Sequence, residues 1–185
     1  MVPPAGCQLY LAAPAELPPD FAETLGAVLE AAEIACLRLS PRLGMEHLVR
    51  LAQGRGTAVV VEADPELAAA LGADGAHLPD LKVYGAARGR LGHDAIIGVS
   101  CGRSRHDAME AGEAGADYIA FAADLELVRW WAELMLVPVV AELESLDQVA
   151  EFAAAGAEFI ALGEALWHDP AGAPAAVRNL SMLLR

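Results

Sequence analysis

Hydrophobic and polar positions follow two alternating patterns along the chain. Short apolar runs rich in β-branched residues are separated by alanine-rich stretches whose apolar residues recur at helical spacing. Four of these runs are CQLYLAA, TAVVVE, AIIGVS and PVVAEL, at residues 7–13, 57–62, 95–100 and 138–143. Runs that are apolar throughout are typical of strands buried on both faces, so the pattern predicts a parallel sheet covered by helices.

A second set of strands follows a repeated sequence. In each copy a helical stretch ends at a glycine, an alanine and an acidic residue follow, and a short apolar run begins. The three clear copies are LGADGAHL, AGADYIAF and AGAEFIAL, at residues 71–78, 114–121 and 155–162. Their acidic residues, with that of a weaker fourth copy in AAEIACLRL, are Asp74, Asp117, Glu158 and Glu33. The copies recur about every 42 residues, the length of two strand–helix units, so one strand of the first set falls in each interval.

Together the two sets predict eight strands that alternate with about eight helices. A single-domain (β/α)8 TIM barrel over residues 1–185 is the economical fold, with short loops because the chain is shorter than most such barrels. The alternative is an open doubly wound sheet, which a glycine-rich turn after the first strand would favour, but LAAPAELPPD has none. In a barrel the repeated acidic residues lie at the amino-terminal face and serve stability, whereas chemistry is expected at the carboxyl ends of the strands.

Capping residues mark the expected helix starts. Asp64 precedes Pro65 at a first helical position. Three capping boxes are also expected, at Asp20 with Glu23, Ser104 with Asp107, and Ser145 with Gln148. Residues 81–93, LKVYGAARGRLGH, contain three glycines, which lower helix propensity, so this segment is expected to be mostly irregular.

Composition narrows the class of protein. Of the 185 residues 56% are hydrophobic, which is enough for one substantial core. The formal charge of −14 argues against nucleic acid or an anionic membrane as a partner. No apolar stretch reaches about 18 residues without a charge, glycine or proline, and no basic segment precedes an apolar run at the amino terminus, so a cytoplasmic protein is expected. Cys7, Cys36 and Cys101 form no Cys-x-x-Cys pair and are expected to be reduced core thiols.

Polar residues at the expected carboxyl ends of the strands are the candidates for chemistry. They include Arg38, Ser40, Glu62, Asp64, His77, Asp80, Ser100, Arg103, Asp124, Glu142, Glu144 and Glu164. No pair among them has the spacing of a metal site or of a nucleophilic triad. The residues alone therefore indicate an acidic barrel mouth with one basic segment, at Arg103 and Arg105.

Four segments resemble thiamine phosphate synthases and their thiazole tautomerase relatives, in order and in spacing: LRLSPR, GADGAHLPD, IIGVSCGRSRHDAMEAGEAGADYIAF and VPVVAE. The resemblance extends over nearly the whole chain. It implies an α/β barrel that joins a pyrimidine methyl diphosphate to a thiazole phosphate in thiamine biosynthesis. It also implies that Mg²⁺ assists the departure of diphosphate, through a carbocation-like intermediate.

The resemblance also implies which residues bind substrate. They are Arg38, Ser100, Arg103, His77 and Gly163, of which Arg38 and Ser100 are the expected catalytic residues. Some of them have a structural interpretation as well. Arg38 either contacts an anionic substrate bidentately or pairs with Glu62 or Asp64 across neighbouring strand ends. Ser100 either binds a phosphate or only ends a strand, and His77 is either a ligand contact or a satisfied core histidine.

The chain departs from the family's pattern at several functional positions. Ala63 and Lys82 stand where the family has carboxylates that bind Mg²⁺, so Glu62, Asp64 or Asp80 is the expected substitute ligand. After the sixth strand FAADLELVRWW lacks the Thr/Lys-rich loop that holds phosphate oxygens, and after the seventh AELES replaces a Gly-Gly turn. These departures predict an eroded active site.

Two classes of function remain open. The first is a transferase of thiamine assembly, or a tautomerase relative, that acts on small phosphorylated molecules with an altered mouth. The second is an inactive barrel re-used to bind a small molecule or a protein. The charge of the mouth distinguishes them, because phosphorylated substrates would be repelled if four carboxylates point inward: Glu62, Glu142, Glu144 and Glu164. In either class we expect a homo-oligomer.

Overall fold

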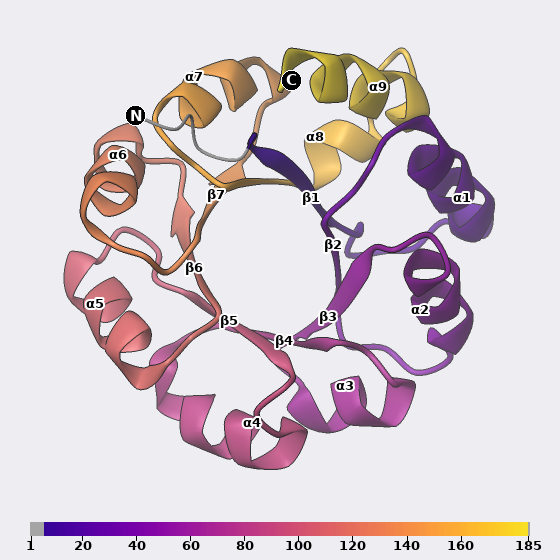
Figure 1. The fold of residues 1–185 in the computed structure, drawn as a ribbon. Coiled ribbons are helices and arrows are strands. Elements are labelled where there is room, and N and C mark those ends of the chain that lie inside the picture. The colour runs from indigo at the N-terminus through magenta and orange to yellow at the C-terminus, as the bar shows by residue number, and fades with distance from the viewer. Residues whose placement is uncertain (1–5, 185) are drawn as a thin grey trace.

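The structure, a computed structural model that describes residues 6–184, is a closed barrel of eight parallel strands in sequence order (Figure 1). The strands are β1 Gln8–Ala12, β2 Cys36–Leu39, β3 Ala58–Glu62, β4 Gly75–Leu78, β5 Ile96–Ser100, β6 Tyr118–Ala122, β7 Val139–Leu143 and β8 Phe159–Leu162. Parallel pairing of β1 with β8 closes the sheet. The predicted (β/α)8 barrel is therefore confirmed, and the doubly wound alternative is wrong.

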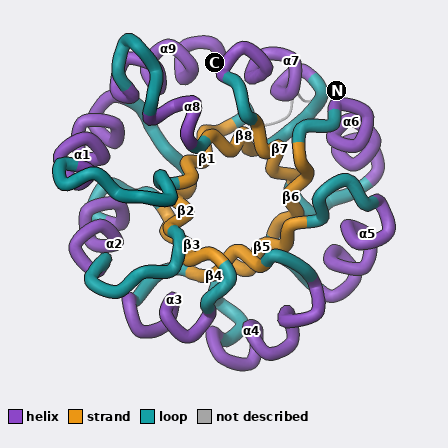
Figure 2. The backbone as a smooth tube through the Cα atoms, turned by 180° about the vertical axis from the view of Figure 1, so that it is seen from behind, coloured by secondary structure: helices purple, strands orange, loops and turns teal. Residues whose placement is uncertain are grey.

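Helices surround the barrel on the outside, as both views along its axis show (Figures 1 and 2). The α-helices are α1 Phe21–Ala31, α2 Glu46–Gln53, α3 Pro65–Leu71, α4 Tyr84–Leu91, α5 Arg105–Ala114, α6 Leu125–Leu134, α7 Val149–Ala154, α8 Glu164–Trp167 and α9 Ala173–Leu183. Two 3₁₀ turns, η1 Leu81–Val83 and η2 Leu146–Gln148, precede α4 and α7. The last helix, α9, packs against α1 and so completes the ring. Within residues 6–184 no helix is long and apolar enough to cross a membrane.

Strand alternation divides the buried residues into two clusters. Successive side chains of a strand point to opposite faces, so every second residue faces the helices and the others face the barrel axis. The larger cluster fills the layer between sheet and helices and includes Leu37, Val59 and Ile119. The smaller cluster lies inside the barrel and consists of Tyr10, Cys36, Val60, Tyr118, Ala120, Val140 and Ala161. Polar residues that are in phase with the smaller cluster at the carboxyl ends of the strands, such as Arg38 and Glu142, therefore face the barrel axis near its mouth.

The repeated acidic residues hold the start of the sheet together. In the three clear copies the acid accepts a backbone N–H from the odd-numbered strand that precedes its own: Asp74 from Val59 at 2.7 Å, Asp117 from Ile97 at 2.8 Å, and Glu158 from Val139 at 2.9 Å. A carboxylate that accepts a backbone N–H makes a charge-assisted hydrogen bond. The repeat thus belongs to the scaffold, as the sequence predicted.

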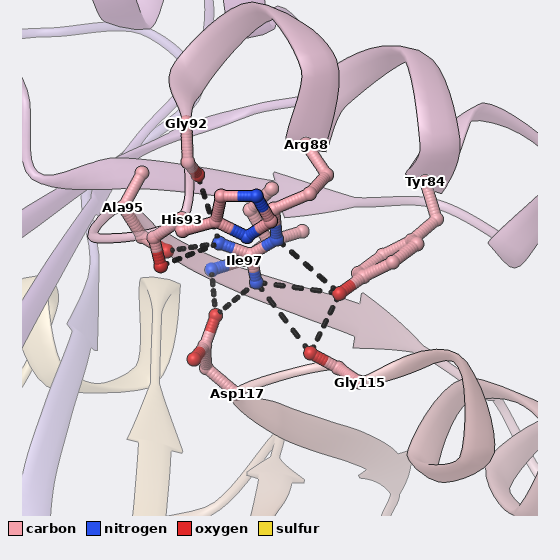
Figure 3. A network of polar contacts seen from close by, with 8 residues as sticks. All are labelled: Tyr84, Arg88, Gly92, His93, Ala95, Ile97, Gly115 and Asp117. Carbon is pink, nitrogen blue, oxygen red and sulfur yellow. Dashed lines mark hydrogen bonds and ion pairs between the residues drawn. The ribbon is translucent and has the colours of Figure 1, made fainter.

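Arg88 ties the Asp117 position to the segment before β5 (Figure 3). Its Nη2 lies 2.7 Å from Asp117 Oδ2, and its Nη1 donates to the carbonyl of Ala95 at 2.7 Å. The Tyr84 hydroxyl donates to the carbonyl of Gly115 at 2.6 Å. These contacts fix residues on both sides of β5 at the amino-terminal face.

The expectation that residues 81–93 are mostly irregular is wrong, because η1 and α4 occupy most of the segment. Tyr84 and Ala87 are buried against the barrel, and Arg88 is held by the network just described. Tertiary contacts of these residues therefore outweigh the low helix propensity of Gly85 and Gly89.

The expected helix caps are present in part. Asp64 accepts the N–H of Leu67 at 2.9 Å and Ser104 that of Asp107 at 3.1 Å, whereas Asp20 makes no side-chain cap bond. Ser145 accepts the N–H of Asp147 at 3.4 Å at the start of η2.

All three cysteines are free, and burial raises the pKa of each thiol to about 12. They remain protonated and unreactive near neutral pH.

Candidate active site

A pocket of about 510 Å³ opens at the carboxyl ends of the strands. We call it the mouth pocket; its lining residues are Ala12, Arg38, Arg103, Ala122, Ala123, Glu142, Leu143, Glu144, Gln148, Ala161, Leu162 and Gly163. The fold thus brings together three of the expected substrate-binding residues, Arg38, Arg103 and Gly163. It does so at the face where barrel enzymes carry their active sites.

An ion pair crosses the inner end of the mouth pocket. Arg38 on β2 places its Nη1 2.6 Å from Oε1 of Glu142 on β7. The two side chains are 15% and 27% exposed, so water screens the pair only in part. Burial alone would lower the pKa of Arg38, but Tyr10 and Glu142 raise it above its usual value, so the guanidinium stays charged. The expected structural partners of Arg38, Glu62 and Asp64, were wrong in identity.

A hydrogen-bonded chain continues from this ion pair down the barrel axis. His77 Nδ1 lies 2.9 Å from the hydroxyl of Tyr118, which lies 3.0 Å from the hydroxyl of Tyr10. On its other side, His77 Nε2 lies 3.9 Å from Oε1 of Glu142, too far for a direct hydrogen bond. Burial, with the positive charge of Arg38, lowers the pKa of His77 to about 3. The imidazole is therefore neutral, and the nearby carboxylate favours the tautomer with its proton on Nε2.

The hydrogen-bonded side chains of His77, Tyr118 and Tyr10 fit inside the barrel because β5 has a glycine, Gly98, where the Tyr118 ring packs against it. A Cβ atom on Gly98 would lie 1.9 Å from the Tyr118 ring. Within residues 6–184, every buried side-chain nitrogen and oxygen has a hydrogen-bond partner. His77, which the sequence left open as a ligand contact or a satisfied core histidine, is 3% exposed, is hydrogen-bonded to Tyr118 and does not line the mouth pocket, as a core histidine would be. Glu142, which lines the pocket, lies between the two, with its Oε1 3.9 Å from His77 Nε2.

Ser100 lies apart from the mouth pocket. It lines a second pocket of about 500 Å³ at the ends of β4 and β5, together with Asp80, Lys82 and Cys101. Asp80 accepts the backbone N–H of Lys82 at 2.8 Å. The two residues expected to be catalytic, Arg38 and Ser100, thus line different pockets, and their catalytic roles stay predictions.

The carboxylates expected to bind Mg²⁺ do not converge. Glu62 is within 3.4 Å of the Ser40 hydroxyl, and Asp64 and Asp80 cap helical turns. In the described part of the chain, one group of three potential ligands lies close enough together to share an ion, and it is exposed on α5: His106, Asp107 and Glu110. Mg²⁺ needs oxygen ligands in near-octahedral geometry. Glu62, Asp64 and Asp80 thus form no three-ligand site among residues 6–184, but Mg²⁺ is usually held by one or two carboxylates with waters and substrate phosphates, so each of them stays a predicted ligand.

Two of the four carboxylates at the strand ends line the mouth pocket, namely Glu142 and Glu144. Glu164 accepts the N–H of Ala15 at 3.2 Å instead. From the sequence we expected Glu142 at a strand end but predicted no ion-pair partner for it, and we predicted no role for Tyr10 and Tyr118. Alternation was the available signal, because these residues are in phase with Arg38 and His77 on strands that close into one barrel.

Comparison with known proteins decides the family. The family model described as thiamine monophosphate synthase matches residues 43–166. The chain belongs to the thiamine-phosphate synthase family. A thiamine-phosphate synthase of Rhodospirillum centenum is 39% identical, over 97% of this chain and 98% of the relative. One of Hyphomonas neptunium is 36% identical, over 95% and 93%.

Solved structures agree on the fold. A thiamine phosphate pyrophosphorylase from Pyrococcus furiosus superposes with a TM-score of 0.84 at 23% identity, covering 96% of this chain and 95% of the other. A tryptophan synthase from M. tuberculosis reaches a TM-score of 0.78 at 18% identity, covering 97% and 94%. At such identities the likeness concerns the barrel and not the chemistry of its mouth.

Proposed function

We propose that this member of the thiamine-phosphate synthase family binds a small phosphorylated molecule in the mouth pocket but forms thiamine phosphate far more slowly than a working synthase. The observation that carries the proposal is the Arg38–Glu142 ion pair of 2.6 Å. Arg38 is the cation that the resemblance assigns to the diphosphate substrate. In this chain a carboxylate of the protein already neutralises it.

Departure of diphosphate requires groups that neutralise negative charge as it develops on the leaving oxygens. Glu144 adds a further negative charge to the mouth pocket, and Lys82 lines the other pocket. Within residues 6–184, the carboxylates Glu62, Asp64 and Asp80 form no group of three that could share one ion. The arrangement therefore supports binding better than it supports the joining reaction.

The phosphate of a ligand is best placed near Arg103 and Gly163. Both line the mouth pocket, and Gly163 follows β8, where barrel proteins frequently bind phosphate. Arg103 uses one N–H for the carbonyl of Ala123, at 3.3 Å. A guanidinium has five N–H donors, so others are left for phosphate oxygens.

Titration with inorganic phosphate, followed by NMR, tests this binding site. Arg103→Ala should weaken binding at least fivefold, because Arg38, the other guanidinium that lines the pocket, is already paired with Glu142. Arg105→Ala is the matched control, since Arg105 lies over the Trp130 ring at 4.8 Å and does not line the pocket. Equal phosphate affinity in the wild type and in Arg103→Ala would refute the assignment.

The same ion pair favours the second class of function, a barrel that binds a ligand without reacting with it. In that case the mouth pocket still binds a small phosphorylated molecule, but the rate of the joining reaction falls to the uncatalysed level. Measurement of that rate with both phosphorylated substrates separates the two classes.

A further inference from the structure

Glu142 makes the contact with Arg38 that an anionic ligand would make. Its Oε1 accepts from Arg38 Nη1 at 2.6 Å, within the mouth pocket. A carboxylate on a guanidinium uses the same charge-assisted hydrogen bonds by which arginine binds phosphates. The side chain of Glu142 thus stands in for a ligand anion at the inner end of the pocket.

We propose that Glu142 determines the specificity of the mouth pocket. By occupying Arg38 it excludes phosphate and diphosphate groups from the inner end of the pocket and selects a ligand group that donates N–H hydrogen bonds, such as an amidine or an amine. This inference rests on the proposed function, because the phosphate of such a ligand then lies at the outer end, with Arg103.

Phosphate and diphosphate are excluded because Glu142 is part of the barrel and is held next to Arg38 by the fold. A group held next to its partner by the fold competes at an effective concentration on the order of millimolar or higher. An incoming anion must displace this carboxylate or share Arg38 with it, and Glu144 lines the same pocket with the same sign of charge. Like charges in a partly desolvated site repel each other more strongly than in water.

The selection of an N–H donor follows from the second oxygen of the carboxylate. Among residues 6–184, Arg38 is the hydrogen-bond donor to Glu142, and it uses Oε1. The side chain is 27% exposed and lines the pocket, so Oε2 is open to a ligand. An ionised carboxylate only accepts hydrogen bonds, which makes N–H groups its natural partners.

Titration with inorganic diphosphate in the presence of EDTA, by calorimetry at constant ionic strength, tests the proposal. Glu142→Gln keeps the shape of the side chain and removes its charge, so diphosphate should bind at least tenfold more tightly than to the wild type. Glu144→Gln removes a charge from the same pocket without touching the Arg38 contact, and its gain should be at most threefold. The double variant Glu142→Gln with Arg38→Met should lose the gain. Circular dichroism melts establish that each variant is folded, and Glu142→Ala repeats the test with the side chain removed.

A second probe, acetamidine, tests the selected group by NMR titration. It should perturb the resonances around Glu142 in the wild type, and the perturbation should be lost in Glu142→Gln. The proposal is overturned if Glu142→Gln binds diphosphate no more tightly than the wild type, if Glu144→Gln gains as much, if the gain survives without Arg38, or if acetamidine leaves these resonances unchanged. Phosphate binding that depends on Arg103 is measured separately, so the specificity proposal can fail while the proposed function stands.

Discussion

Replacement of Asp117 by alanine removes the repeated acidic residue whose carboxylate accepts a backbone N–H and also forms an ion pair. Its carboxylate accepts the backbone N–H of Ile97 at 2.8 Å and lies 2.7 Å from Nη2 of Arg88. We expect Asp117→Ala to lower the free energy of unfolding by about 2 kcal/mol.

The magnitude is the sum of two unequal contributions. Loss of a hydrogen bond between a charged group and a backbone N–H at the start of β5 costs about 1.5 kcal/mol or more. Asp117 is 44% exposed, so its ion pair with Arg88 adds only about 0.5 kcal/mol. Arg88 keeps the carbonyls of Gly92 and Ala95, so its charge is not left without partners.

Urea denaturation followed by circular dichroism measures the change, with the slope of the transition required to match the wild type. Glu113→Ala is the control, because Glu113 is an exposed acid on the neighbouring helix α5, and its change should stay within about 0.5 kcal/mol. Glu158→Ala loses the Val139 contact of 2.9 Å and should fall between the two. If Asp117→Ala denatures at the same urea concentration as the wild type, the repeated acids do not stabilise the scaffold.

Three further predictions follow from the same contacts. Gly115 ends α5 with a φ of +92°, and an added Cβ would lie 3.4 Å from the Tyr84 hydroxyl, so Gly115→Val should destabilise the protein by about 1 kcal/mol or more in urea. The pKa of His77 is about 3 in the folded protein and about 6.5 in the unfolded chain, which takes up a proton as the pH falls. Stability is therefore lost as the pH falls below 6.5, and His77→Gln should remove roughly 2 kcal/mol of the loss between pH 7 and pH 5, measured by urea denaturation at both; an unchanged loss would contradict the buried neutral imidazole. In a double-mutant cycle, Arg38→Met and Glu142→Gln should couple by about 1 kcal/mol or more, and additive effects would contradict the ion pair.

The scaffold could be predicted from the sequence because its signals are local. The apolar runs, the glycine that ends each helix and the acid that follows lie within eight residues of one another, as in LGADGAHL. Residues 81–93 were the exception, because Arg88 is held by Ala95 and Asp117, which no local pattern connects with it. The prediction that this segment is irregular depended on its three glycines alone, and the contacts of Arg88 outweigh their low helix propensity.

The centre of the mouth pocket could not be predicted in the same way. Arg38 and Glu142 are 104 residues apart, and they meet only because β2 and β7 face each other across the closed barrel. The sequence identified both residues as strand-end candidates, and the alternation of each strand fixed the face on which they lie. Which charges meet across the axis depends on the closure of the barrel and on the lengths of the side chains.

Formation of thiamine phosphate tests most directly the claim that this barrel keeps the family's scaffold without the charge arrangement that diphosphate departure needs. The purified protein and the Rhodospirillum centenum relative would be assayed side by side with both phosphorylated substrates and excess Mg²⁺, and the product followed by chromatography. With Arg38 neutralised by Glu142 and the expected metal ligands apart, we predict a rate at least about 10³-fold below that of the relative, the cost of one lost electrostatic donor at its upper end. A rate within about tenfold of the relative would contradict the account, because Glu142 would then have to leave Arg38 during turnover.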